Sequence, residues 1–230
     1  MALRAIVFDF DGVIANSEPL HFQAFRDVLA KHSVDLTQVD YYARCLGLDD
    51  VGVFATMNDE FSKGWSERDR ADMVADKALR LAELERDVSV LIPGAADAIR
   101  RAAASVPIAI ASGALGPEIR RTLDREQLTR HFVAIVSAED TPLSKPAPDP
   151  YQLAVFLLRK HIGGTPLQPS ECVAIEDSRW GLESARLAGL RTVGVTSAYD
   201  RSELEPLSDL IIGSLAELNL QNLRDLLSSS

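Results

Sequence analysis

Short apolar runs typical of buried strands alternate with amphipathic helical segments along most of this chain, which restricts the folds it can adopt. The predicted strands cover residues 3–8, 108–111, 132–137, 172–175, 192–195 and 210–212. The helices predicted around the later strands cover residues 95–104, 116–126, 150–161, 179–188 and 215–227, and Gly189 is expected just beyond the fourth of them. This alternation predicts an α/β fold with a Rossmann-like parallel sheet flanked by helices.

A block without a convincing strand separates the first predicted strand from the others. It contains helices predicted at 19–31, 39–46, 49–60 and 67–87, with Ser66 as the N-cap of the last. Pro93-Gly94 then marks a boundary. We therefore expect a core domain from residues 1–16 and 91–230, and an inserted all-α cap domain from residues 17–90. Two linkers would let such a cap close over the sheet edge and exclude water.

Composition limits the partners and the compartment. With 34 acidic and 24 basic residues the net charge is −10, which disfavours broad binding to nucleic acid or to anionic membranes. No apolar stretch is long enough to span a bilayer, and the first apolar run is too short for a signal peptide. Cys45 and Cys172 are far apart and are expected to be buried thiols. We expect a cytoplasmic protein.

Two aspartates follow the first predicted strand directly. Asp9 and Asp11 are separated by one residue, with Gly12 behind them. In extended backbone such residues point the same way, so both carboxylates can face one site beyond the end of the strand. They could be a nucleophile and an acid/base partner near Mg²⁺. A helix N-cap or a turn is the alternative.

Polar residues stand at three later positions, two of them directly behind predicted strands. Ser112 and Gly113 could bind a phosphate oxygen or form an ordinary turn. Lys145 lies on a loop with three prolines, where its ammonium could pair with Asp9 and with phosphoryl oxygens. Glu176 and Asp177 could bind a metal ion or cap the following helix, and both roles are compatible.

The order DFDG, Ser-Gly, Lys-Pro and Glu-Asp-Ser resembles the haloacid dehalogenase-like hydrolase superfamily. The subgroup it resembles has a helical cap and includes β-phosphoglucomutase and phosphoglycolate phosphatase-like enzymes. The resemblance implies that Asp9 is the nucleophile and Asp11 the acid/base. It implies Mg²⁺ held by Asp9, the Asp11 carbonyl and Asp177, with Glu176 as a further acidic position. Ser112, Gly113 and Lys145 would bind the phosphate.

Three residues of the predicted cap resemble substrate-contacting positions of the family. Glu18 and His21 match linker and first-helix positions, and Lys77 lies on the last cap helix. His21 could equally be a structural histidine and Lys77 a solvated lysine.

Two features of the sequence help to choose among the activities found in the superfamily. Asp11 disfavours dehalogenation, because a halide leaving group needs no proton. Residues 114–116 lack the side-chain donors that hold a second phosphate in the mutase. The segment 46–50 also has an acid where the mutase has a phosphate-binding arginine, although Arg44 is close.

The sequence therefore predicts a Mg²⁺-dependent phosphatase. Its substrate would be a small phosphomonoester, either a sugar phosphate or a phosphoglycolate-like metabolite, hydrolysed through an aspartyl phosphate. The first alternative is a β-phosphoglucomutase-like phosphotransferase. The second is a non-enzymatic phospho-receiver or metal-binding domain.

Overall fold

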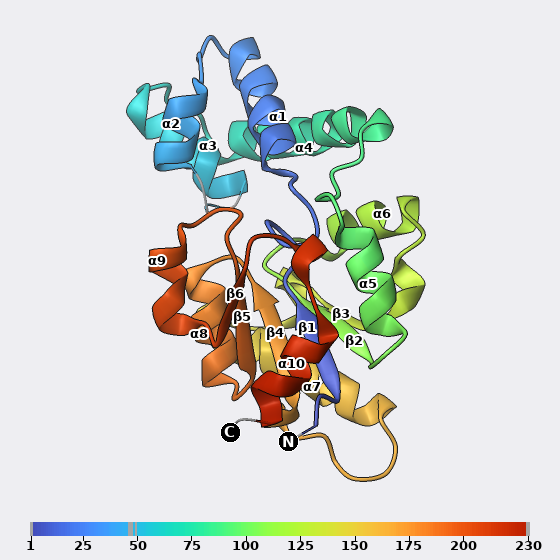
Figure 1. Cartoon of the computed structure of the whole chain (residues 1–230). Coiled ribbons are helices and arrows are strands. Elements are labelled where there is room, and N and C mark those ends of the chain that lie inside the picture. The colour runs from blue at the N-terminus through green and yellow to red at the C-terminus, as the bar shows by residue number, and fades with distance from the viewer. Residues whose placement is uncertain (1, 46–47, 49, 229–230) are drawn as a thin grey trace. The chain divides into compact units, whose positions relative to one another are not determined.

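The computed structural model describes residues 2–45, 48 and 50–228 of the 230-residue chain. It divides into two compact units, one formed by residues 1–16 and 91–230 and the other by residues 17–90. The first unit is an α/β core, and in the described part of the second unit the secondary-structure elements are helices joined by loops (Figure 1).

The core is built on a parallel sheet of six strands in the order β3-β2-β1-β4-β5-β6. The strands are β1 (Ala5–Phe8), β2 (Ile108–Ala111), β3 (Phe132–Val136), β4 (Cys172–Glu176), β5 (Arg191–Val195) and β6 (Leu210–Ile212). The first four residues of β4 and all of β1 and β2 are buried and apolar, as expected for strands covered on both faces. The α/β fold class predicted from the sequence is confirmed.

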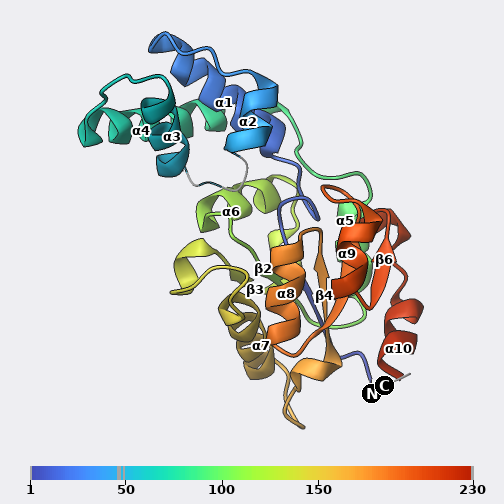
Figure 2. The ribbon, with the colours of Figure 1, turned by 90° about the vertical axis from the view of Figure 1, so that its left-hand side faces the viewer.

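Helices cover both faces of this sheet (Figure 2). On one face α7 (Asp149–His161) and α8 (Arg179–Leu187) pack against small strand residues such as Val7 and Ala109. On the other lie α5 (Ala95–Ala103) and α10 (Leu220–Ser228). The short helix α6 (Gly116–Arg125) follows β2, and α9 (Arg201–Leu204) follows β5.

The prediction of one helix over residues 215–227 was wrong. A 3₁₀ turn, Leu215–Glu217, comes first and α10 begins only at Leu220. Leu218 between them is extended, with φ −60° and ψ 113°, and the Asn219 side chain accepts a hydrogen bond from the Gln221 amide at 2.8 Å. An asparagine that bonds the backbone two residues on competes with helix continuation. The short helix α9 was not predicted.

The helical unit consists of α1 (Glu18–Lys31), α2 (Gln38–Arg44), α3 (Asp50–Glu60) and α4 (Glu67–Leu84). Its core contains buried aromatic residues, with Phe25 against both Phe54 and Tyr41. Ser66 caps α4 as predicted, accepting from the Asp69 amide. The predicted helix ends at residues 46 and 49 lie outside the described residues.

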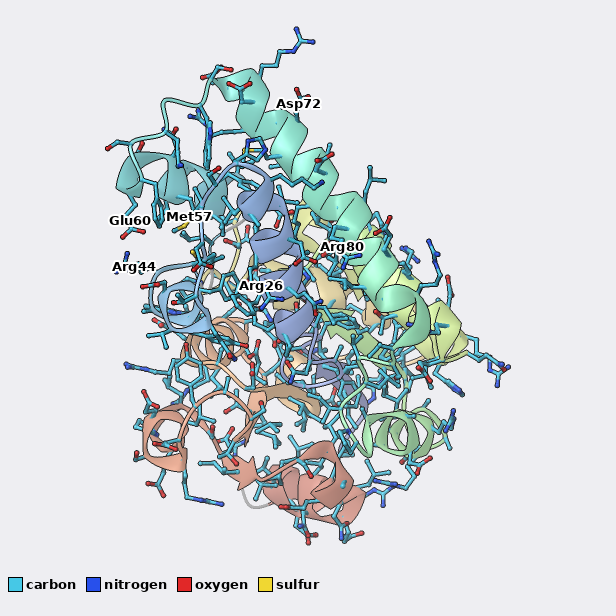
Figure 3. The ribbon with its side chains drawn as sticks, turned by 90° about the horizontal axis from the view of Figure 1, so that it is seen from above. Arg26, Arg44, Met57, Glu60, Asp72 and Arg80 are labelled. Atoms are coloured by element: carbon cyan, nitrogen blue, oxygen red, sulfur yellow. The ribbon has the colours of Figure 1, made fainter. Side chains whose placement is uncertain are left out.

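Ion pairs join the helices of this unit on its surface (Figure 3). Arg80 of α4 donates to Asp27 of α1 at 2.9 Å, and Arg44 of α2 pairs with Glu60 of α3. Among the described helices of either unit, none is long and apolar enough to cross a membrane.

Candidate active site

The register of the sheet brings the predicted polar residues to one edge. Phe8 of β1 lies opposite Ile110 of β2 and Ile175 of β4, so the residues following these strands meet beyond the same ends. The Asp9 amide still donates to the Ile175 carbonyl at 2.9 Å. Asp9 and Asp177 are therefore neighbours although 168 positions separate them in the sequence.

Lys145 connects the acids of β1 and β4. Its Nζ lies 2.6 Å from Asp9 Oδ1 and 2.5 Å from Glu176 Oε1, and its side chain is 12% exposed. The expected ion pair with Asp9 is thus present. Burial lowers the pKa of Lys145, but the carboxylates of Asp9 and Glu176 outweigh it and raise that pKa above its ordinary value. The lysine is therefore a permanent cation in this site.

Three carboxylates form a cluster with donor spacing suited to a metal ion. One oxygen each from Asp9, Glu176 and Asp177 lies within 4.8 Å of the others, and all three residues are buried. Burial, with repulsion from Glu176, raises the pKa of Asp177 to about 7. Burial and the same neighbour also raise the pKa of Asp9 well above its usual value, although Lys145 opposes the shift. One lysine leaves this cluster with excess negative charge, which a divalent cation would stabilise.

Asp11 is only half-buried, whereas the intervening Phe10 is buried in the core. The charge of Asp11 contributes to the raised pKa of Asp177. The extended backbone of β1 ends at Phe8 and the chain bends at Phe10, so the alternation expected for Asp9 and Asp11 stays a prediction.

Two glycines leave room for the acids of β4. Gly12 has φ 73°, and a Cβ there would overlap the Asp177 carboxylate. A Cβ at Gly181, in the first turn of α8, would overlap the carboxylate of Glu176. Neither glycine was among the site residues predicted from the sequence, although Gly12 belongs to the DFDG element.

Ser112 and Gly113 follow β2 as predicted. Ser112 is buried; its amide donates to the Val136 carbonyl, and its Oγ accepts from the Ala114 amide at 3.0 Å. Apart from Gly113 itself and its two chain neighbours, no atom of the described residues lies within 4 Å of the position that a Gly113 Cβ would take. The hydroxyl proton of Ser112 can be donated to a phosphate oxygen.

A carboxylate that the sequence did not indicate caps α6, the helix after Ser112 and Gly113. Glu139 Oε2 accepts from the Gly116 amide at 3.0 Å. This bond lowers the pKa of Glu139, so the side chain is an anion at neutral pH. The positive end of α6 is thus already occupied by a negative charge of the protein itself.

Glu176 has two neighbours that the sequence also did not reveal. The hydroxyl of Tyr151 donates to Glu176 Oε1 at 2.9 Å, and that of Ser178 donates to Oε2 at 3.0 Å. Ser197 donates to Asp177 Oδ2 at 3.2 Å. A tyrosine in an amphipathic helix is typical of the core, so sequence gave no signal for Tyr151.

The three predicted substrate residues of the helical unit are bonded within that unit. Glu18 accepts from the Tyr41 hydroxyl at 2.5 Å. Lys77 has no exposed side-chain surface; its Nζ lies 2.7 Å from Asp50 Oδ1 and 3.0 Å from His21 Nδ1. Lys77 is therefore not a solvated lysine.

Comparison with known proteins identifies the family of this chain. Residues 6–195 match the family model described as haloacid dehalogenase-like hydrolase. The chain is 32% identical to Protein CbbY of Rhodobacter capsulatus over 98% of its length and all of that protein. It is 29% identical to hexitol phosphatase B of Escherichia coli K12, covering 96% of each. A crystal structure of CbbY from Rhodobacter sphaeroides with xylulose-(1,5)bisphosphate matches with TM-score 0.76 and 28% identity, over 94% of this chain and 96% of that one.

Proposed function

Because the chain belongs to the haloacid dehalogenase-like hydrolase family and is a phosphoric monoester hydrolase, we propose that it is a Mg²⁺-dependent sugar-phosphate phosphatase. The observation that carries the proposal is the contact of Lys145 with Asp9 beside Asp177, at the strand ends where α/β enzymes bind ligands. The similarity to hexitol phosphatase B agrees with it.

The side chains suit two successive phosphoryl transfers. An oxygen of Asp9 attacks phosphorus, and the bond to the sugar oxygen breaks while Asp11 gives that oxygen its proton. Water then attacks the aspartyl phosphate, Asp11 accepts the proton, and the bond between phosphorus and Asp9 breaks. Lys145 neutralises Asp9 and the transferring oxygens, and Ser112 and Gly113 bind the remaining ones.

The acidic cluster fits Mg²⁺, which favours carboxylate and carbonyl oxygens. Asp9 and Asp177 would hold it, with the main-chain carbonyl of Asp11, and Glu176 is the further acidic candidate. When bound, the ion supplies positive charge for the phosphate and allows Asp9 and Asp177 to ionise together, against the raised pKa that burial imposes on each.

The surroundings of the phosphate motif favour a substrate with a single phosphate. Residues 114–116 offer no side-chain donor, and Glu139 already accepts from the Gly116 amide. In the helical unit Arg44 is paired with Asp40 and Glu60, and Lys77 with Asp50. These cations are thus already neutralised. The bisphosphate complex of the related CbbY is the opposing observation, so a pentulose bisphosphate must be among the substrates tested.

The test is phosphate release from p-nitrophenyl phosphate with Mg²⁺, followed by a panel of sugar monophosphates, sugar bisphosphates, phosphoglycolate and nucleotides. Asp9→Asn should abolish release, and EDTA should do the same reversibly. Activity of Asp9→Asn equal to wild type would refute the nucleophile.

Two alternatives have their own outcomes in the same experiment. A mutase would convert β-glucose 1-phosphate to the 6-phosphate, primed by a bisphosphate, faster than it releases phosphate. A receiver domain would accumulate a long-lived aspartyl phosphate without turnover.

A further inference from the structure

A continuous buried polar chain runs from α7 to the proposed nucleophile. The Tyr151 hydroxyl donates to Glu176 Oε1 at 2.9 Å, the same oxygen lies 2.5 Å from Lys145 Nζ, and Lys145 Nζ lies 2.6 Å from Asp9 Oδ1. Tyr151 and Glu176 have no exposed surface.

Packing of the apolar core does not explain why residue 151 carries a hydroxyl group. Its ring lies in the apolar cluster between the sheet and α7, where phenylalanine would fill the same volume. Burying a hydroxyl among apolar groups is unfavourable unless it is hydrogen-bonded. Here the bond goes to Glu176, and burial together with that carboxylate raises the pKa of Tyr151 well above its usual value. Tyr151 is thus a hydrogen-bond donor throughout the working pH range.

Glu176 is held at both of its oxygens. Oε2 accepts from the amides of Asp177 and Ser178 and from the Ser178 hydroxyl, at 3.0 to 3.2 Å, at the N-terminus of α8. Oε1 accepts from Tyr151 and Lys145. Without the tyrosine hydroxyl, Lys145 would be the one remaining side-chain donor to Oε1 among the described residues, and its ammonium could follow the carboxylate as it rotates.

We propose that Tyr151 is a positioning residue for Lys145, acting through Glu176. The hydroxyl fixes the orientation of the Glu176 carboxylate, and this carboxylate fixes the ammonium of Lys145 beside Asp9. Tyr151 contacts neither phosphate nor metal. The proposal rests on the proposed function, in which Lys145 neutralises Asp9 and the transferring oxygens.

Tyr151→Phe tests this by removing one oxygen atom. With p-nitrophenyl phosphate, kcat should fall about tenfold, the usual scale for losing a supporting hydrogen bond behind a site. KM and the Mg²⁺ activation constant should stay within about twofold, because the substitution leaves the carboxylates of Asp9 and Asp177 and the phosphate-binding Ser112 and Gly113 unchanged.

Thr192→Val is the matched control. Thr192 is fully buried in β5, and its hydroxyl donates to the Leu207 carbonyl at 2.8 Å, so this variant also loses one buried hydroxyl. It should lower the unfolding midpoint and leave kcat unchanged. Equal losses of kcat in both variants, or wild-type kcat in Tyr151→Phe, would overturn the proposal.

The Lys145→Met background gives a second kinetic test. If Tyr151 acts only through Lys145, adding Tyr151→Phe to Lys145→Met should change kcat by less than about twofold. A further tenfold loss in the double variant would mean that the hydroxyl acts on something else.

The position of the ammonium can also be followed without turnover. In ¹H–¹⁵N spectra the Lys145 ammonium signal, assigned by its absence in Lys145→Met, should broaden or shift in Tyr151→Phe and stay unchanged in Thr192→Val. An unchanged signal in Tyr151→Phe refutes the positioning role even if the protein is no phosphatase. Failure of the proposed phosphatase function would be detected separately, either as wild-type activity of Asp9→Asn or as no phosphate release from any compound of the substrate panel.

Discussion

Gly12 and Asp177 occupy one space at the edge of the sheet: the carboxylate of Asp177 lies where a Gly12 side chain would be. The glycine also has φ 73°, a left-handed conformation that residues with a side chain adopt only at a cost. The glycine of the DFDG element is therefore needed both for the turn and for the acid that comes from β4.

Gly12→Ala should displace Asp177 and weaken metal binding. We expect the Mg²⁺ activation constant to rise at least about tenfold. Gly164→Ala is the control, because Gly164 has φ 84° but nothing within 4 Å of its Cβ position. It carries the same kind of backbone strain without the overlap, so its activation constant should equal that of wild type. An equal rise in both variants would show that strain alone is responsible.

The buried acids predict an unusual pH dependence of stability in the metal-free protein. The pKa of Asp177 is raised to about 7, so the folded state holds a proton that the unfolded state has lost near pH 4. Its contribution is therefore largest below about pH 4 and is lost as the pH rises to about 7. Asp9 shifts in the same direction.

Urea unfolding in EDTA at several pH values from 4 to 8 measures this effect. The free energy of unfolding of wild type, minus that of Asp177→Asn, should decrease as the pH rises across this range. Saturating Mg²⁺ should reduce the decrease, because the ion binds the ionised carboxylates. A difference independent of pH would contradict the raised pKa.

Glu139 should discriminate against a second phosphate. Its carboxylate is an anion at the N-terminus of α6, where the main-chain amide of Gly116 would otherwise be available. Glu139→Gln should raise kcat/KM for a sugar bisphosphate about fivefold relative to the matching monophosphate, since one repulsive charge is removed. Glu126→Gln, beyond the other end of the same helix, should leave that ratio unchanged. If the ratio of kcat/KM for the bisphosphate to that for the monophosphate is unchanged in Glu139→Gln, the Glu139 carboxylate does not contribute to this specificity.

Asp50 should stabilise the buried ammonium of Lys77. In Asp50→Ala the ammonium keeps its contacts with His21 Nδ1 and with the ring of Phe25, whose centroid is 4.7 Å away, but loses its carboxylate partner. Since Asp50 is 29% exposed, we expect a loss of about 2 kcal/mol in the free energy of unfolding, below the value for a fully buried pair. Adding Lys77→Met should recover most of it, as measured by urea unfolding. A double variant as unstable as the sum of the single ones would exclude coupling.

The strands of the sheet could be predicted from the sequence, because each is a local apolar run. The grouping of Asp9, Lys145 and Asp177 at one edge could also be predicted, because parallel strands end at the same edge of a sheet. The sequence could not predict that β1 lies between β2 and β4, since strand order depends on tertiary packing. Tyr151 and Glu139 were missed for the same reason. Each acts on a residue more than 20 positions away, and each fits an ordinary local pattern, a core aromatic and a surface acid.

The position of β1 in the sheet also has a consequence for how the enzyme is made. β1 is flanked by β2 at residues 108–111 and by β4 at residues 172–176. During synthesis the strand that directly precedes the proposed nucleophile leaves the ribosome about 160 residues before its second neighbour does. Pairings between strands that are so far apart in the sequence form slowly. Chains that end before β4 would thus carry the nucleophile without its metal-binding partner, and the capacity for phosphoryl transfer would arise only once β4 and Asp177 have been translated.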